Sequence, residues 1–144
     1  MRRFYWHSDR GSASAELVLL AGLVLMFALA CVGFGRLALA NMTVQSAVSA
    51  AAREASLART DSEAQTSAHD TANAALNSSG IYCRSLTVTV DTSGMNVPLG
   101  QVGMVSSTIT CDVELSDIAL PGLPGSKQMT ATASSPVDPY RERR

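Results

Sequence analysis

The apolar residues of this chain are concentrated in one uninterrupted run near its amino terminus. Residues 17–35 (LVLLAGLVLMFALACVGFG) contain no charged side chain. A helix of that length spans about 28 Å, close to the roughly 30 Å hydrocarbon core of a bilayer. Three arginines precede the run, whereas only Arg36 follows it closely. Because positive charge gathers on the cytoplasmic side of a span, the pattern predicts a membrane helix with residues 1–10 in the cytoplasm and residues 36–144 outside it.

Two other kinds of segment have a similar composition. A secretory signal peptide has an apolar region of roughly 7–15 residues followed by a small-x-small cleavage site. Residues 38–40 (ALA) supply such a site, but the run is long and Arg36 interrupts it. A lipoprotein signal would use Cys31, but Leu29 stands where a small residue is expected. A retained membrane anchor fits the length of the run best.

The helical pattern continues beyond the apolar run. Residues 36–59 contain no Gly or Pro and are rich in Ala. Apolar residues recur there at helical spacing on one stripe: Leu37, Val44, Val48, Ala51 and Ala55. This spacing predicts one continuous helix of about 45 residues that starts near Ser14. A helix bent or broken near residues 33–35 (GFG) is the alternative.

A second helix is predicted directly after the first. Thr60 and Glu63 form a capping-box sequence, which favours a helix from about Asp61 to Leu76. Residues 77–80 (NSSG) end the helical pattern. The apolar stripe of this helix consists of small residues only: Ala64, Ala68, Ala72 and Ala75.

From residue 81 onward the apolar residues alternate with polar ones, as in half-buried strands. Three such stretches are Leu86–Val90, Val105–Leu115 and Gln128–Ala133. Gly- and Pro-containing turns separate them, and connections this short favour an antiparallel meander. The predicted fold class is therefore α+β, with a long amino-terminal helix, a second short helix and a small antiparallel sheet of about three strands.

The same patterns divide the chain into segments. In order they are a basic cytoplasmic leader (1–11), the membrane helix (12–35), its amphipathic extension (36–60), the second helix and turn (61–80), an extracytoplasmic sheet (81–135) and a polar tail (136–144).

Two of the three cysteines fall in the part predicted to lie outside the cytoplasm. Cys83 and Cys111 are expected to pair there, because thiols in an oxidising compartment are more often joined than free. Two unpaired buried thiols are the alternative. Strict alternation places Cys83 on the face opposite Val88, whereas Cys111 shares its face with Val113. The disulfide therefore requires that Cys83 precede the strand, or that the strand contain a bulge.

Charge and motif content exclude several classes of function. Eleven basic and twelve acidic residues give a net charge of -1, which leaves no basic field for nucleic acid. His69 has only His7 as another histidine and no cysteine at ligand spacing, so no metal site is expected. No nucleotide-binding loop, metalloprotease motif or carboxylate–histidine arrangement occurs. We expect no catalytic residues and no cofactor.

The most informative motif lies where the apolar run begins. Glu16 directly precedes the run, and Gly11 stands five residues earlier, after Arg10. This is the pattern of a prepilin cleavage site, in which Gly presents an unhindered peptide bond to a membrane-embedded peptidase. Cleavage would leave a new amine on Ser12, with which the Glu16 carboxylate of the same or a neighbouring subunit can pair. The alternative is that Glu16 only marks the membrane interface.

Several segments together resemble TadE-like proteins, the minor pseudopilins of the Tad (tight adherence) pilus system. They are residues 10–16 (RGSASAE), the apolar run, residues 33–37 (GFGRL) and residues 50–55 (AAAREA). The resemblance implies processing by the system's prepilin peptidase and a role in assembling or priming Flp-type pili. The implied partners are the lipid bilayer, other pilin or pseudopilin subunits and the membrane platform proteins of the system.

Carried over to this sequence, the resemblance makes Gly11 the residue before the scissile bond, Ser12 the new terminus and Glu16 the acidic position of the motif. Leu17 departs from the Flp pilin motif, which has an aromatic residue after Glu. The alternative from another class is a membrane-anchored exported binding domain unrelated to pili, with residues 1–40 as an ordinary anchor or signal.

Overall fold

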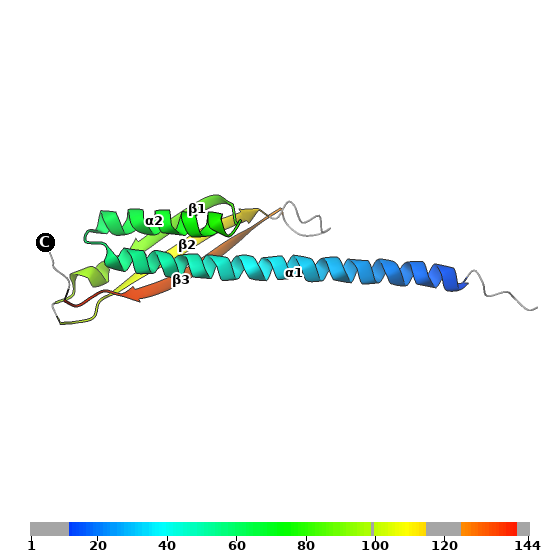
Figure 1. Ribbon diagram of the computed structural model, residues 1–144, viewed down its shortest axis with the longest axis horizontal. Coiled ribbons are helices and arrows are strands. Elements are labelled where there is room, and N and C mark those ends of the chain that lie inside the picture. The colour runs from blue at the N-terminus through cyan, green and yellow to red at the C-terminus, as the bar shows by residue number, and fades with distance from the viewer. Residues whose placement is uncertain (1–11, 99, 115–124, 141–144) are drawn as a thin grey trace, which may run out of the picture. The chain divides into compact units, whose positions relative to one another are not determined.

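The computed structural model describes residues 12–98, 100–114 and 125–140. Its elements in chain order are the helices α1 (Ser12–Leu57) and α2 (Asp61–Ser78), strand β1 (Cys83–Asp91), the 3-10 helix η1 (Ser93–Asn96), and strands β2 (Met104–Glu114) and β3 (Ser126–Pro136) (Figure 1). The predicted α+β class is confirmed. The chain divides into two compact units, residues 1–36 and residues 37–144. We call the second unit the head.

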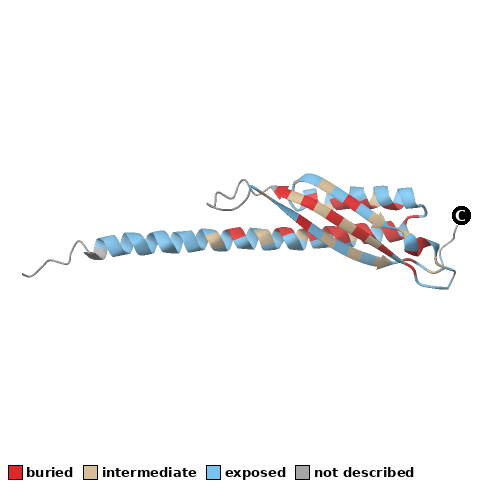
Figure 2. Ribbon diagram, turned by 180° about the vertical axis from the view of Figure 1, so that it is seen from behind, coloured by how far each residue is buried: buried red, intermediate tan, exposed pale blue. Residues whose placement is uncertain are grey.

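In the first unit, α1 is apolar and its large side chains are exposed (Figure 2). The mean hydropathy of its most apolar window is 2.8, and the helix is long and apolar enough to cross a membrane. The helix is continuous through residues 33–35, so the alternative of a break there is wrong. A helix that is apolar on all sides is suited to surroundings that are apolar on all sides.

Within the head, the remaining part of α1 buries the predicted stripe. Val44, Val48, Ala51 and Ala55 are fully buried, and Leu37 packs against the same core as a partly buried side chain. From α2 the core receives Ala64, Ala68, Ala72 and Leu76, whereas the predicted Ala75 is only partly buried. The residues that the two helices contribute to the core are mostly alanines, so the helices fill their side of the core with small side chains.

Both ends of α2 are capped. The hydroxyl of Thr60 accepts a hydrogen bond from the backbone N–H of Glu63 at 3.2 Å, as the capping box predicts. The Glu63 carboxylate accepts from the N–H of Arg59 at 2.9 Å, one residue before the cap. At the other end Gly80 has φ +73, and the N–H of Ile81 donates to the carbonyl of Leu76. That six-to-one bond closes a Schellman motif, whose left-handed position favours glycine.

The sheet has the order β1-β2-β3 and is antiparallel throughout, as the short connections predict. One face packs on the two helices and contains Val88, Val105, Ile109, Val113 and Met129 (Figure 2). The opposite face is covered with hydroxyl groups that pair across β2 and β3. The pairs are Ser106–Ser134 at 2.7 Å, Thr108–Thr132 at 3.0 Å and Thr110–Thr130 at 3.3 Å. The predicted alternation extends to Val113, and Leu115 lies outside the described residues.

Cys83 and Cys111 form a disulfide that joins β1 to β2, with their Cα atoms 5.4 Å apart. The register of the two strands shifts between Cys83 and Leu86, so that Cys83 lies opposite Val113 while Leu86 lies opposite Cys111. This irregularity is the bulge that the alternation pattern required. It turns the Cys83 side chain toward the face that also holds Cys111.

A close backbone contact fixes the connection between β1 and β2. A Cβ atom added to Gly94 in η1 would lie 2.1 Å from the carbonyl oxygen of Met104, and one added to Gly103 would lie 1.8 Å from the carbonyl oxygen of Gly94. Only glycine permits this approach. At the start of the turn, Asp91 accepts a hydrogen bond from the backbone N–H of Ser93 at 3.0 Å. This bond, together with one from the Ser93 hydroxyl, lowers the pKa of Asp91.

We predict that Gly103→Ala destabilises the head by about 3 kcal/mol or more, because the added methyl group overlaps backbone atoms that cannot move aside. Gly125→Ala is the matched control, since no atom lies within 4 Å of its added Cβ. The free energy of opening, measured by hydrogen exchange of the β2 amides in the full chain, checks the difference. Equal protection in the two variants would contradict the close contact.

Replacing Cys83 and Cys111 together with Ser is expected to lower the stability of the head by roughly 2–5 kcal/mol, because the unfolded chain loses a covalent restraint. Cys31→Ser is the control, since Cys31 is exposed on α1 and unpaired. Denaturation with and without reductant gives the difference. Labelling of the denatured, unreduced chain should detect one thiol, and labelling of three would contradict the disulfide.

Candidate functional site

The residues of the predicted cleavage motif lie at the start of α1. Gly11 lies outside the described residues, as does the rest of the predicted leader. Ser12 is the first residue of the helix, and Glu16 is exposed four residues later. Positions four apart share one face of a helix and are separated by about 6 Å along its axis. An amine at residue 12 and the carboxylate of residue 16 would therefore lie on the same side of the first turns.

Glu16 has no partner in the part of the chain that the structure describes. Neither an ion pair nor a hydrogen bond engages its side chain there. It is also the sole charged residue in the sequence from Gly11 to Gly35. A carboxylate beside an apolar run is costly to desolvate unless a cation pairs with it. The geometry thus leaves the Glu16 carboxylate available to a positive group from outside the described residues.

The apolar surface after Glu16 is larger than a soluble domain exposes. The large side chains concerned all have at least half of their surface exposed: Leu17, Val18, Leu19, Leu20, Leu23, Val24, Leu25, Met26, Phe27, Leu29, Val32 and Phe34. An exposed apolar surface of this size marks a membrane or a protein interface. Since the residues surround the helix on all sides, a bilayer is the simplest medium for them.

Exposed apolar side chains also occur where α1 enters the head. Leu39 is 64% exposed and Met42 is 69% exposed. They border a shallow groove between α1 and the end of α2, which is otherwise lined by Thr43, Ser46, Ala47, Ala75, Ser78 and Ser79. The sequence alone did not reveal this groove, because its second wall comes from α2. It contains no titratable side chain, so it offers surface for contact rather than groups for catalysis.

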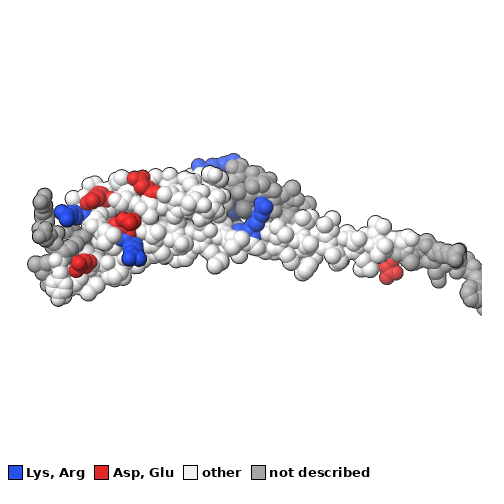
Figure 3. All heavy atoms as spheres, in the orientation of Figure 1, with Lys and Arg blue, Asp and Glu red and all other residues white. Residues whose placement is uncertain are grey.

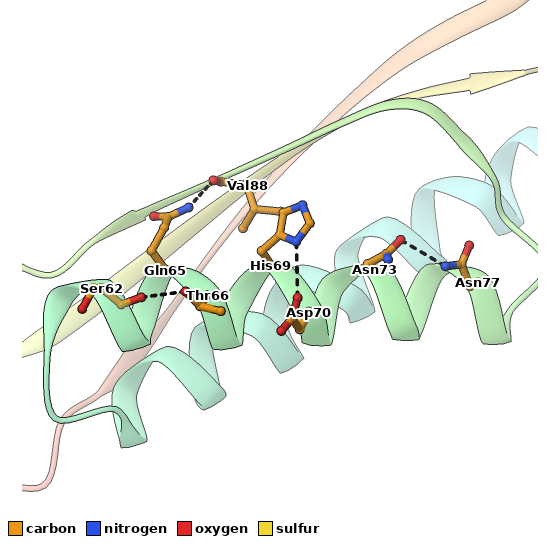
Figure 4. Close-up of polar contacts among 8 residues, drawn as sticks. All are labelled: Ser62, Gln65, Thr66, His69, Asp70, Asn73, Asn77 and Val88. Carbon is orange, nitrogen blue, oxygen red and sulfur yellow. Dashed lines mark hydrogen bonds and ion pairs between the residues drawn. The ribbon is translucent and has the colours of Figure 1, made fainter.

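The charged side chains in the described part of the head are scattered. On the visible face, acidic and basic side chains are interspersed (Figure 3). His69 lies 3.6 Å from the carboxylate of Asp70, and both side chains are exposed to solvent (Figure 4). Across residues 12–98, 100–114 and 125–140, no group of three or more His, Cys, Asp or Glu residues is placed to hold a metal ion.

Comparison with known proteins bears on the amino-terminal helix. A family model described as TadE-like protein matches residues 11–53. The matched segment begins at Gly11, includes Glu16 and the whole apolar run, and ends within the part of α1 that packs in the head. No curated protein and no solved structure matches the chain.

The segment that matches is therefore the one in which the sequence resemblance was seen, and the matched residues include every position of the predicted cleavage motif except Arg10. The sheet and α2 lie outside the match. Residues 11–53 are therefore similar to TadE-like proteins, and this similarity associates the chain with the Tad pilus system.

Proposed function

We propose that the chain is a non-enzymatic minor pseudopilin that takes part in assembling or priming a Flp-type pilus. In this proposal α1 anchors it in the cytoplasmic membrane, with the amino terminus in the cytoplasm and the head outside. The observation that carries the proposal is α1 itself. One continuous helix holds the TadE-like match, the unpaired Glu16 carboxylate and an apolar segment long enough to span a bilayer.

The chemistry of the proposal begins with removal of the leader. A prepilin peptidase cleaves after Gly11 and leaves a free amine on Ser12. That amine carries a positive charge near neutral pH, and it pairs with Glu16 of the same or a neighbouring subunit. Pairing offsets the cost of burying the carboxylate when helices bundle. Uncleaved subunits lack this amine, so cleavage would control entry into the assembly.

The head supports a location outside the cytoplasm. Its disulfide between Cys83 and Cys111 suits an oxidising compartment. The basic residues before the span favour the same orientation. The partners in this proposal are the lipid bilayer, the peptidase, other pilin or pseudopilin subunits and the Tad membrane platform proteins.

The competing proposal is an exported binding domain for which residues 1–40 are an ordinary anchor or a cleaved signal, and the head argues against the cleaved form. Its cleavage site would follow Ala40, but residues 38–40 are helical and Ala40 is buried in the core of the head. A peptidase needs an extended chain, which this segment would provide only if the start of the head's helix unwound. The family match, which begins at Gly11, also favours the pilus proposal.

We predict that Gly11→Ala slows leader removal and that Gly11→Val blocks it, because the peptidase must approach an unhindered backbone. Mass spectrometry of the membrane-bound protein should then find residues 1–11 retained. Gly22→Ala is the matched control, since no atom lies within 4 Å of its added Cβ and it lies within the apolar run. Normal processing of Gly11→Val would contradict cleavage at this bond.

Glu16→Ala is expected to spare membrane insertion and to impair assembly. Removing the charge lowers the cost of insertion, by at most about 3 kcal/mol at the centre of a span and by less at its edge. What the variant loses is the partner for the Ser12 amine. The amount of protein in the membrane fraction and the number of surface pili measure the two effects separately. Glu63→Ala, in the cap of α2, is a control that removes a carboxylate from the head. A normal number of pili with Glu16→Ala would show that the carboxylate is not needed for assembly and only marks the membrane interface.

A further inference from the structure

The two edges of the sheet differ in whether their backbone groups are paired. A sheet edge presents N–H and C=O groups that readily pair with a strand of another chain. At the edge of β1, the side chain of Gln65 in α2 occupies these groups. Its Nε2 donates to the carbonyl of Val88 at 2.5 Å, and its Oε1 accepts from the N–H of Val90 at 3.1 Å. Figure 4 shows Gln65 reaching from α2 to Val88.

Gln65 thus replaces the peptide group of an adjacent strand. The other polar side chains drawn on α2 form local contacts within the helix. Thr66 donates to the carbonyl of Ser62, Asn77 donates to Asn73, and His69 faces Asp70 (Figure 4). Among these side chains, Gln65 alone reaches the sheet, and it does so with both its donor and its acceptor.

The bonds of Gln65 also show which backbone N–H and C=O groups face outward at the edge of β3. Successive residues of a strand direct their N–H and C=O groups to opposite sides. Since Val88 and Val90 direct theirs to Gln65, Thr87 and Thr89 direct theirs to β2. The strand register then turns Ile109 toward β3 and its partner Ala131 toward β2.

The outward residues of β3 are consequently the alternate ones, Gln128, Thr130, Thr132 and Ser134. In the part of the chain that the structure describes, no hydrogen bond engages the backbone groups at this edge. Pro136 is the next residue in the series and has no N–H, so it ends the run of donors. The β3 edge is therefore open, whereas the β1 edge is occupied at its centre.

Strand direction decides how copies of the head would meet. Both β1 and β3 run antiparallel to β2, so they are parallel to each other. The proposed membrane anchor, on which this step rests, gathers copies of the chain in one bilayer, and heads that share one strand direction can extend each other's sheet. Heads that meet side by side then bring β3 of one copy along β1 of the next. Pairing two β3 edges in antiparallel fashion would instead reverse the strand direction from one head to the next.

Sideways pairing of β3 with β1 is a head-to-tail contact, so each added head presents another β3 edge for a further copy. Confinement in the membrane raises the effective concentration of such edges. We propose that Gln65 blocks this addition, so that the β3 edge of a second copy cannot extend the sheet at β1. Gln65 keeps the heads separate while α1 remains free to bundle.

The test uses the full chain in detergent micelles and compares particle masses by light scattering. Gln65→Leu removes both bonds at nearly constant volume, and we expect its particles to exceed the wild-type mass by whole copies of the chain. Thr66→Ala is the matched control on α2 and should keep the wild-type mass. If the Gln65→Leu chain does not form the Cys83–Cys111 disulfide, its head has not folded, and the Gln65→Ala variant is measured instead.

A second substitution tests whether the added copy pairs through the edge of its β3 strand. Thr132→Pro removes an outward N–H from β3 at a position where the β2 ladder does not need it, so the double variant with Gln65→Leu should return to the wild-type mass. A Gln65→Leu particle of wild-type mass would overturn the proposal. So would a larger particle that Thr132→Pro leaves unchanged. Neither result depends on cleavage or piliation, so a failure here is distinct from a failure of the proposed pilus role.

Discussion

A single helix has to satisfy two different surroundings along its length, and the rest of the structure follows from that constraint. From residue 17 to residue 35, α1 exposes apolar side chains on every side. From Leu37 onward it has one buried stripe, and its exposed surface is mixed, with polar residues beside Leu39, Met42 and Leu57. Backbone hydrogen bonds are satisfied within the helix in both parts, which is what allows one element to pass from a segment exposed on every side to a protein core without a break. The head is built on the second part only.

The core of the head is built mostly from small side chains. The stripe residues that α1 and α2 contribute to the core are mostly alanines, and the largest fully buried side chains in the core are only Leu76, Ile109 and a few valines. Such a core buries little apolar area for each residue, and a small domain of this kind benefits from additional restraints. The disulfide, the capped ends of α2 and the glycine contact between η1 and β2 supply them. Each acts on the backbone rather than through bulk in the core.

Local patterns in the sequence predicted most of this fold. The uncharged run predicted the apolar helix, the spacing of Val44, Val48 and Ala51 predicted its buried stripe, and Thr60 with Glu63 predicted the start of α2. These signals succeed because each depends on neighbours within a few residues. The conflict between Cys83 and strand alternation also pointed to a bulge, and the register shift before Leu86 contains it.

The features that were missed depend on contacts between distant segments. Gly94 and Gly103 were interpreted as turn residues, because nothing local shows that their backbones touch. Nothing in the local sequence distinguishes Gln65 from the other polar residues of α2, since its two partners lie more than twenty residues away on β1. The cleavage motif itself is visible only in the sequence, because Gly11 lies outside the described residues.

The central claim is that the mature chain begins at Ser12, because pairing between its amine and Glu16 requires that cut. The most direct test is the amino-terminal sequence of the wild-type protein purified from membranes of a strain with an intact prepilin peptidase. The account predicts Ser-Ala-Ser-Ala-Glu as the first five residues. A mature protein that begins at Met1 would contradict it, and one that begins at Asn41 would instead establish an ordinary cleaved signal.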